Sequence, residues 1–173
     1  MIIVKKNSGF TLIELLAVIV ILAVLLGIAV PMVSGYMTNS KRETYIDSIK
    51  LYIDDVKAKQ ATREYIFTNP DVTYYIAFEN IDTDIKKARP VADWEEGYVI
   101  VVYDKESKTY DYYITAVDEA GYKVDITEET ELDKDLVVKT DDSSLSVGTS
   151  IGDRSRIILY DKNGEKKEIT PSS

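Results

Sequence analysis

The side chains that could do chemistry in this chain are carboxylates, lysines and tyrosines, because it contains no cysteine and no histidine. Disulfides and Cys/His zinc sites are therefore excluded, and the commonest general base near neutral pH is missing.

Acidic residues cluster at Asp54-Asp55, Asp82/Asp84, Glu128-Glu129 and Asp141-Asp142. A calcium site needs about six or more oxygen ligands, and none of these segments has the spacing of an EF-hand loop. No glycine loop has the form that holds a phosphate. We therefore expect no catalytic residue, no metal and no cofactor, and we predict that the chain is not an enzyme.

Glu14 is the one charged residue in the apolar stretch between Phe10 and Val33. A carboxylate inside a membrane helix costs about 2.5–3.5 kcal/mol and usually has a partner. A cut between Gly9 and Phe10 would create an α-amino group on Phe10, with a reference pKa of about 7.7–8.0. We hypothesise that this amine pairs with Glu14 of a staggered neighbouring chain and sets the axial register of an assembly.

The apolar run is long enough to cross a bilayer, because roughly 20 apolar residues span its core. An ordinary secretory signal has a shorter run and a small-residue cleavage site after it, whereas Ser8-Gly9 precedes the run here. Lys5 and Lys6 would hold the leader on the cytoplasmic side and leave the C-terminal part outside. We predict a cleaved leader at residues 1–9 and a transmembrane and assembly helix at residues 10–35.

The N-terminal segment resembles the processing signature of type IV prepilins and pseudopilins. The residues that carry the likeness are Lys5-Lys6-Asn7-Ser8-Gly9-Phe10-Thr11-Leu12-Ile13-Glu14, followed by the apolar helix. The resemblance implies cleavage after Gly9 by a prepilin peptidase and N-methylation of Phe10. It also implies that Glu14 matches the glutamate proposed to meet the N-terminal amine of a neighbouring subunit. A plain signal anchor would explain neither the Gly9–Phe10 junction nor the placed acid.

Gly27 and Pro31 form a weak point in the predicted helix. Pro31 cannot donate a hydrogen bond to the carbonyl of Gly27, which is itself the poorest non-proline helix former. We predict a kink or loosening there. By resemblance, the comparable segment of pilins loses helicity in the filament and lets the filament stretch.

Residues 36–62 read as an amphipathic continuation of the helix. Apolar side chains recur at three- and four-residue steps, which predicts one buried face. They are Tyr45, Ile46, Ile49, Tyr52, Ile53 and Val56.

Residues 63–173 change to strand-like patterns and predict a β-sheet head. We expect strands at 72–78, 97–103, 109–117, 122–126, 156–160 and 165–169, an edge strand within 132–139, a helical turn at 83–88 and a polar loop at 140–153. Residues 97–126 should form an antiparallel meander, and Asn163-Gly164 should turn the last hairpin.

The fold class is α+β, with a long N-terminal helix, half transmembrane and half amphipathic, packed on an antiparallel sheet of four to six strands. This outline resembles cysteine-free pilins, such as those of Gram-positive anaerobes, and lacks the cysteine-closed loop of many Gram-negative pilins.

The leading functional hypothesis is structural. The net charge of −9 argues against a nucleic-acid partner for the subunit. We expect a pilin that polymerises through its apolar helix into an extracellular type IV pilus, after residing in the cytoplasmic membrane. By resemblance, its partners are other pilins, the prepilin peptidase, an assembly ATPase and a membrane platform protein, and motility or adhesion would belong to the whole fibre.

Two alternatives stay open. One is a minor pilin or pseudopilin of a secretion or competence system, which abundance in sheared filaments would separate from a major pilin. The other is a membrane-anchored binding module that never polymerises, which a mature N-terminus at Met1 would favour.

Overall fold

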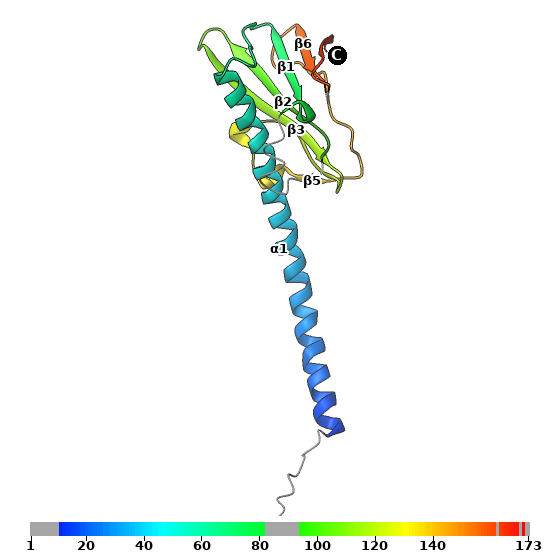
Figure 1. The fold of residues 1–173 in the computed structure, drawn as a ribbon. Helices are drawn as coiled ribbons and strands as arrows, with labels where there is room; N and C mark the ends of the chain where they lie inside the picture. Colours follow the sequence, from blue (N-terminus) through cyan, green and yellow to red (C-terminus); the bar gives the residue numbers. More distant parts are fainter. Residues whose placement is uncertain (1–10, 82–93, 162, 170, 172–173) are drawn as a thin grey trace, which may run out of the picture. The chain divides into compact units, whose positions relative to one another are not determined.

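The computed structural model describes residues 11–81, 94–161, 163–169 and 171, and for residues 28–37 it describes the backbone alone. Its contacts divide the chain into two compact units, Met1–Ser40 and Lys41–Ser173, which we treat separately. The helix α1 (Leu12–Ala61) contributes to both units (Figure 1). The α+β class predicted from the sequence is confirmed.

In the first unit, α1 begins at Leu12 and continues without a break through Gly27 and Pro31. The helix is therefore not broken there, and the kink or loosening predicted around these two residues stays a prediction, because a continuous helix can still bend. Among the described residues, no helix has both the length and the hydropathy that crossing a membrane requires. The transmembrane segment predicted at residues 10–35 is thus not confirmed; residue 10 and the side chains of residues 28–37 lie outside the description.

In the second unit, the remainder of α1 buries the predicted apolar stripe. The six stripe residues are at most 5% exposed: Tyr45, Ile46, Ile49, Tyr52, Ile53 and Val56. Their three- and four-residue spacing places them on one face of the helix, which packs against a sheet. The helix ends where Arg63 takes a left-handed conformation with φ 64°. The Arg63 N–H donates to the Gln60 carbonyl at 3.0 Å, and the Glu64 N–H donates to the Lys59 carbonyl at 2.9 Å. These bonds satisfy carbonyls that the last helical turn leaves open.

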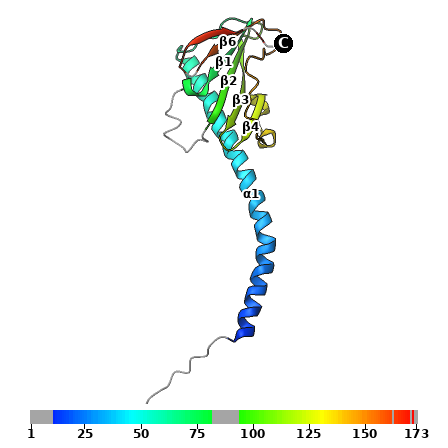
Figure 2. The ribbon, with the colours of Figure 1, turned by 90° about the vertical axis from the view of Figure 1, so that its right-hand side faces the viewer.

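The described part of the second unit holds a seven-stranded sheet in the order β5-β4-β3-β2-β1-β6-β7 (Figures 1 and 2). The strands are β1 (Val72–Ala77), β2 (Trp94–Asp104), β3 (Thr109–Asp118), β4 (Tyr122–Glu128), β5 (Val138–Lys139), β6 (Arg156–Tyr160) and β7 (Lys166–Ile169). Among the residues that the structure describes, three short 3-10 helices lie between the strands: η1 (Phe78–Asn80), η2 (Glu129–Glu131) and η3 (Lys134–Leu136).

The predicted meander is confirmed as β2-β3-β4, with antiparallel pairing throughout. Two expectations for the sheet are wrong. Within the described residues it has seven strands rather than four to six, and it is mixed, because β1 pairs with β6 in parallel, Thr73 opposite Ile157. A parallel pair needs a long connection, and the chain between β1 and β6 provides one by way of β2 to β5. The predicted edge strand shrinks to Val138–Lys139 because η3 takes up part of residues 132–139. The helical turn predicted at residues 83–88 lies outside the described residues.

Both faces of the sheet are covered. On the face toward α1, Tyr52 stacks on Phe78 with ring centroids 3.9 Å apart, and Trp94 meets Phe78 edge-on at 5.3 Å. On the opposite face, Val147 and Ile151 pack beside a small cluster formed by Tyr75, Ile100 and Ile157. The segment predicted only as a polar loop at 140–153 therefore acts as the cover of the second face.

Candidate functional site

The described chain begins with a capping box at the start of α1. Thr11 is the residue before the first helical residue, and Glu14 is the third residue of the helix. The Glu14 N–H donates to Thr11 Oγ1 at 3.3 Å. In return, Glu14 Oε2 accepts from the Thr11 N–H at 2.8 Å and from the Thr11 hydroxyl at 2.7 Å. This reciprocal pattern satisfies two backbone donors that the first helical turn would otherwise leave open.

The position of Glu14 differs from the one expected from the sequence. The hypothesis placed a carboxylate one turn inside a helix that starts at Phe10, but the helix starts at Leu12 and Glu14 lies in its first turn. An acid there interacts favourably with the helix dipole and is already hydrogen-bonded, so it needs no second charge to be stable in the isolated chain.

The capping box is compatible with cleavage after Gly9. The Thr11 N–H belongs to the peptide bond between residues 10 and 11, and a cut between residues 9 and 10 leaves that bond intact. Both Thr11 donors act on Glu14 Oε2. The carboxylate can therefore cap its own helix through one oxygen and offer the other to a cation from a second chain.

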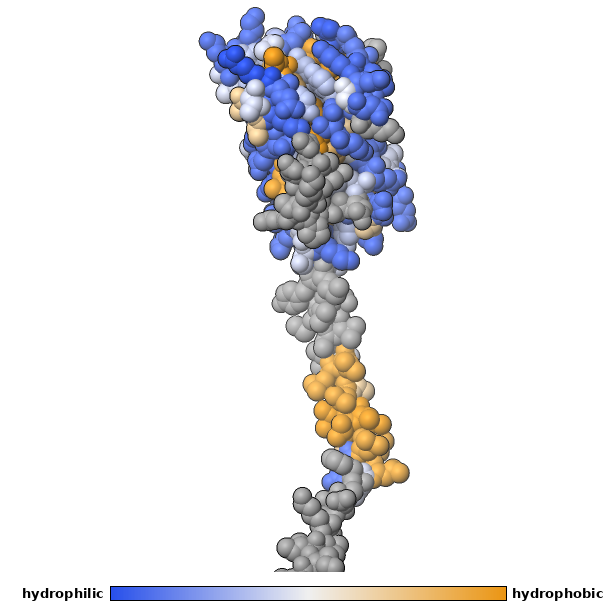
Figure 3. Space-filling view, viewed as in Figure 1, coloured by the Kyte–Doolittle hydropathy of each residue, from blue (hydrophilic) through white to orange (hydrophobic). Residues whose placement is uncertain are grey.

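The helix surface that follows is apolar on all sides. Its large apolar side chains are 49–86% exposed: Leu12, Ile13, Leu15, Leu16, Val18, Ile19, Val20, Ile21, Leu22, Val24, Leu25 and Leu26. Figure 3 shows the resulting apolar surface. A contiguous apolar surface of this extent is typical of a segment covered by lipid or by another protein.

The other predicted site residues are not brought together with Glu14. A Cβ added at Gly27 would meet no atom within 4 Å. Gly27 lies thirteen positions after Glu14 in the helix, which corresponds to about 20 Å along the axis. The backbone of Pro31 is helical, and its side chain lies outside the description. Lys5, Lys6, Gly9 and Phe10 also lie outside the described residues. The structure therefore describes Glu14 and Gly27 fully and leaves the cleavage junction as a prediction.

Residues 4–30 match the family described as the prokaryotic N-terminal methylation motif. The chain carries the signature of type IV pilins and pseudopilins. The matched range includes the basic leader, the Gly9–Phe10 junction, Glu14 and Gly27. This pilin signature covers the N-terminal part of the chain alone. Searches of curated proteins and of solved structures found no match to the chain.

Thr11 is the residue of this pilin signature whose role sequence reasoning missed. The signal was present, because a threonine followed three residues later by glutamate, ahead of an apolar run, is the sequence pattern of a capping box. Elsewhere in the described part of the chain, no group of three or more acidic residues could hold a metal ion.

Proposed function

We propose that the chain is a structural, non-enzymatic subunit that polymerises through its apolar N-terminal helix into an extracellular type IV pilus filament. One observation carries the proposal: the methylation motif at residues 4–30 runs directly into a helix whose apolar side chains are exposed on every side. The described contacts leave this surface uncovered. In the cytoplasmic membrane lipid would cover it, and in the filament the helices of other copies would replace the lipid.

The charge at the helix start gives the assembly its direction. Helices in a membrane gain little from apolar contact alone, because lipid tails are as apolar as leucine, so a placed polar contact decides which copies join and at what stagger. In this proposal the prepilin peptidase cuts between Gly9 and Phe10, and the methylated amine of Phe10 meets, on the next copy, the Glu14 oxygen that does not accept from Thr11. An assembly ATPase and a membrane platform protein supply the force, and loosening between Gly27 and Pro31 gives the fibre extra length under load.

The test separates the capping role of Glu14 from its charge. Glutamine is also a capping-box residue, so Glu14→Gln should still accept from the Thr11 N–H while losing the charge. Removing one partner of a buried ion pair costs about 3–5 kcal/mol, so we expect Glu14→Gln to insert in the membrane but give few or no filaments. Thr11→Val is the matched control, because it removes the hydroxyl from the cap and keeps the carboxylate.

Filaments would be sheared from cells and quantified beside the membrane fraction. Loss of filaments in Glu14→Gln together with their retention in Thr11→Val supports the proposal. Normal filaments from Glu14→Gln would contradict the ion pair. If the wild-type chain is abundant in the membrane but makes up only a trace of sheared fibres, this result would favour the minor pilin or pseudopilin instead.

A further inference from the structure

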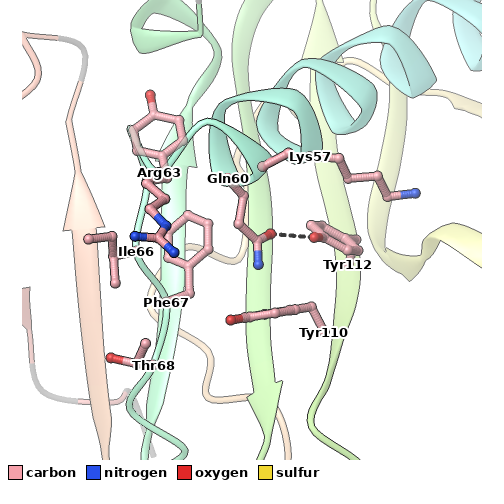
Figure 4. Close-up of a pocket in the computed structure, with 10 residues that line it drawn as sticks. Lys57, Gln60, Arg63, Ile66, Phe67, Thr68, Tyr110 and Tyr112 are labelled. Atoms are coloured by element: carbon pink, nitrogen blue, oxygen red, sulfur yellow. Dashed lines mark hydrogen bonds between the residues drawn. The ribbon is translucent and has the colours of Figure 1, made fainter.

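A pocket of about 610 Å³ opens in the second unit beside the C-terminal end of α1. The residues that matter for its chemistry are Lys57, Gln60, Arg63, Ile66, Tyr110 and Tyr112. We call it the Arg63 pocket. Figure 4 shows Gln60 of the helix end facing Tyr112 of β3, and the ring of Phe67, which also lines the pocket, is buried. The volume lies within the range of about 300–1,000 Å³ that is usual for small-ligand sites.

Arg63 is held in an unfavourable backbone conformation at this pocket. Its φ of 64° is one that glycine adopts freely and that costs a residue with a side chain on the order of 1 kcal/mol. The position follows the last helical turn, where glycine is the usual residue. Among the described residues, no carboxylate forms an ion pair with the guanidinium of Arg63. Strain of this kind is typical of functional positions, and here it holds at the pocket a guanidinium that none of the described carboxylates pairs with.

Several of the remaining polar groups of the pocket are already engaged with protein partners. The Tyr112 hydroxyl donates to Gln60 Oε1, which leaves the Gln60 amide nitrogen to point toward Tyr110 (Figure 4). Lys57 lies 4.9 Å from the centre of the Tyr112 ring and pairs with Glu129 at 2.5 Å. None of the described residues that line the pocket is acidic, although the whole chain has 30 acidic residues. The Arg63 guanidinium and the Gln60 amide, in a lining whose described residues include no acid, favour a ligand that carries a carboxylate.

The pocket also offers apolar surface. Ile66 is 61% exposed, which is unusual for a large apolar side chain in this unit. Tyr110 is half-buried, and its ring packs against Tyr103 with centroids 5.1 Å apart. A sugar ring presents hydroxyl groups along its edge and C–H groups on its faces, which fit tyrosine rings and apolar side chains.

We propose that the Arg63 pocket binds a carboxylate-bearing saccharide, with the guanidinium of Arg63 on the sugar carboxylate and Tyr110 against the sugar ring. This goes beyond filament formation and does not depend on it, since every lining residue lies in the unit Lys41–Ser173. A short oligomer of galacturonate is the simplest probe of this chemistry.

The test measures binding of trigalacturonate to the full-length chain in detergent by isothermal titration calorimetry. Arg63→Gly is the sharpest variant, because it removes the guanidinium and relieves the backbone strain. It should melt at a higher temperature than the wild type and yet bind at least about tenfold more weakly, as expected for a lost charge-assisted hydrogen bond. Arg63→Gln should weaken binding in the same way. Arg156→Gln is the matched control, since Arg156 is exposed and pairs with Glu168 away from the pocket.

Trigalacturonate binding that both Arg63 variants lose and Arg156→Gln keeps would support the proposal. No measurable binding, equal binding in the Arg63 variants, or equal affinity for neutral galactose oligomers would overturn it. If acetate competes at a similar concentration, the pocket binds simple anions and the proposal of a saccharide ligand fails. Preferential binding of a peptide with the acidic sequence of residues 128–135 would replace the saccharide by a second copy of the chain.

Discussion

Gly97→Ala tests the packing of the second unit most sharply. Gly97 lies on β2, and a Cβ added there would lie 2.9 Å from Phe78 Cγ and closer still to two other carbons of the ring. The ring cannot move aside, because it is stacked on Tyr52 and held edge-on by Trp94. Overpacking of a tight core costs about 1–3 kcal/mol, and we expect the upper half of that range. For a unit of this size the melting temperature should fall by roughly 5–15 °C.

The assay is thermal unfolding of the full-length chain in detergent, followed by the fluorescence of Trp94, the single tryptophan. Gly27→Ala is the matched control, because its new Cβ meets nothing within 4 Å and should leave the transition unchanged. The double variant Gly97→Ala/Phe78→Leu should lose less stability than the sum of the single variants, because the smaller side chain makes room for the methyl group. An unchanged melting temperature in Gly97→Ala, or strict additivity in the double variant, would refute this account of the core.

Three further predictions concern single residues of the second unit. Burial raises the pKa of the Asp118 carboxyl, so its ionisation opposes folding, and stability should fall as the pH rises from about 4 through the folded-state pKa. Asp118→Asn, which can still accept from the Tyr122 N–H, should raise the melting temperature at pH 7 and flatten its dependence on pH; a lower and equally pH-dependent value would contradict this. Tyr45→Phe removes the hydroxyl that donates to the buried Ala116 carbonyl at 2.6 Å and should cost about 1–3 kcal/mol in urea unfolding, whereas no change would show that the carbonyl finds another donor. Arg63→Gly should raise the urea midpoint by relieving the left-handed backbone, and a lower midpoint would mean that the side chain stabilises the helix end.

The parts of the fold that sequence predicts well are those set by local patterns. The burial of Tyr45, Ile49 and Tyr52 follows from the helical period of the apolar residues. The meander β2-β3-β4 follows from consecutive strands joined by short turns. Gly121 supplies the positive φ of the second turn, and its N–H donates to the Asp118 carbonyl at 2.9 Å.

The parts that sequence does not predict depend on contacts between distant segments. Nothing in residues 156–160 indicates that they pair in parallel with β1, because strand patterns specify which faces are buried and not which strand lies alongside. The segment that covers the second face of the sheet is equally hard to predict from the sequence. It depends on Val147 and Ile151, two isolated apolar residues in a polar segment, and on the Tyr75 hydroxyl, which donates to the Thr149 carbonyl at 2.7 Å.

The two candidate sites also differ in how far the sequence predicts them. The N-terminal signature is contiguous, so its junction and Glu14 could be predicted from the residues, and the capping bond to Thr11 also had a sequence signal that was overlooked. The Arg63 pocket was not predicted, because Arg63 and Tyr110 are far apart in the sequence and become neighbours only when the end of α1 packs beside β3. The left-handed backbone of Arg63 carries no sequence signal, since the residue there is not glycine.

Mass spectrometry of the N-terminus in sheared fibres tests the central claim most directly. Fibres would be sheared from cells that express the native chain, and their subunits would be analysed intact and after digestion. We predict a mature chain that begins at Phe10 with a methylated α-amino group and is enriched in the fibre fraction. A chain that still begins at Met1, or one that is processed but absent from every sheared fibre, would contradict it.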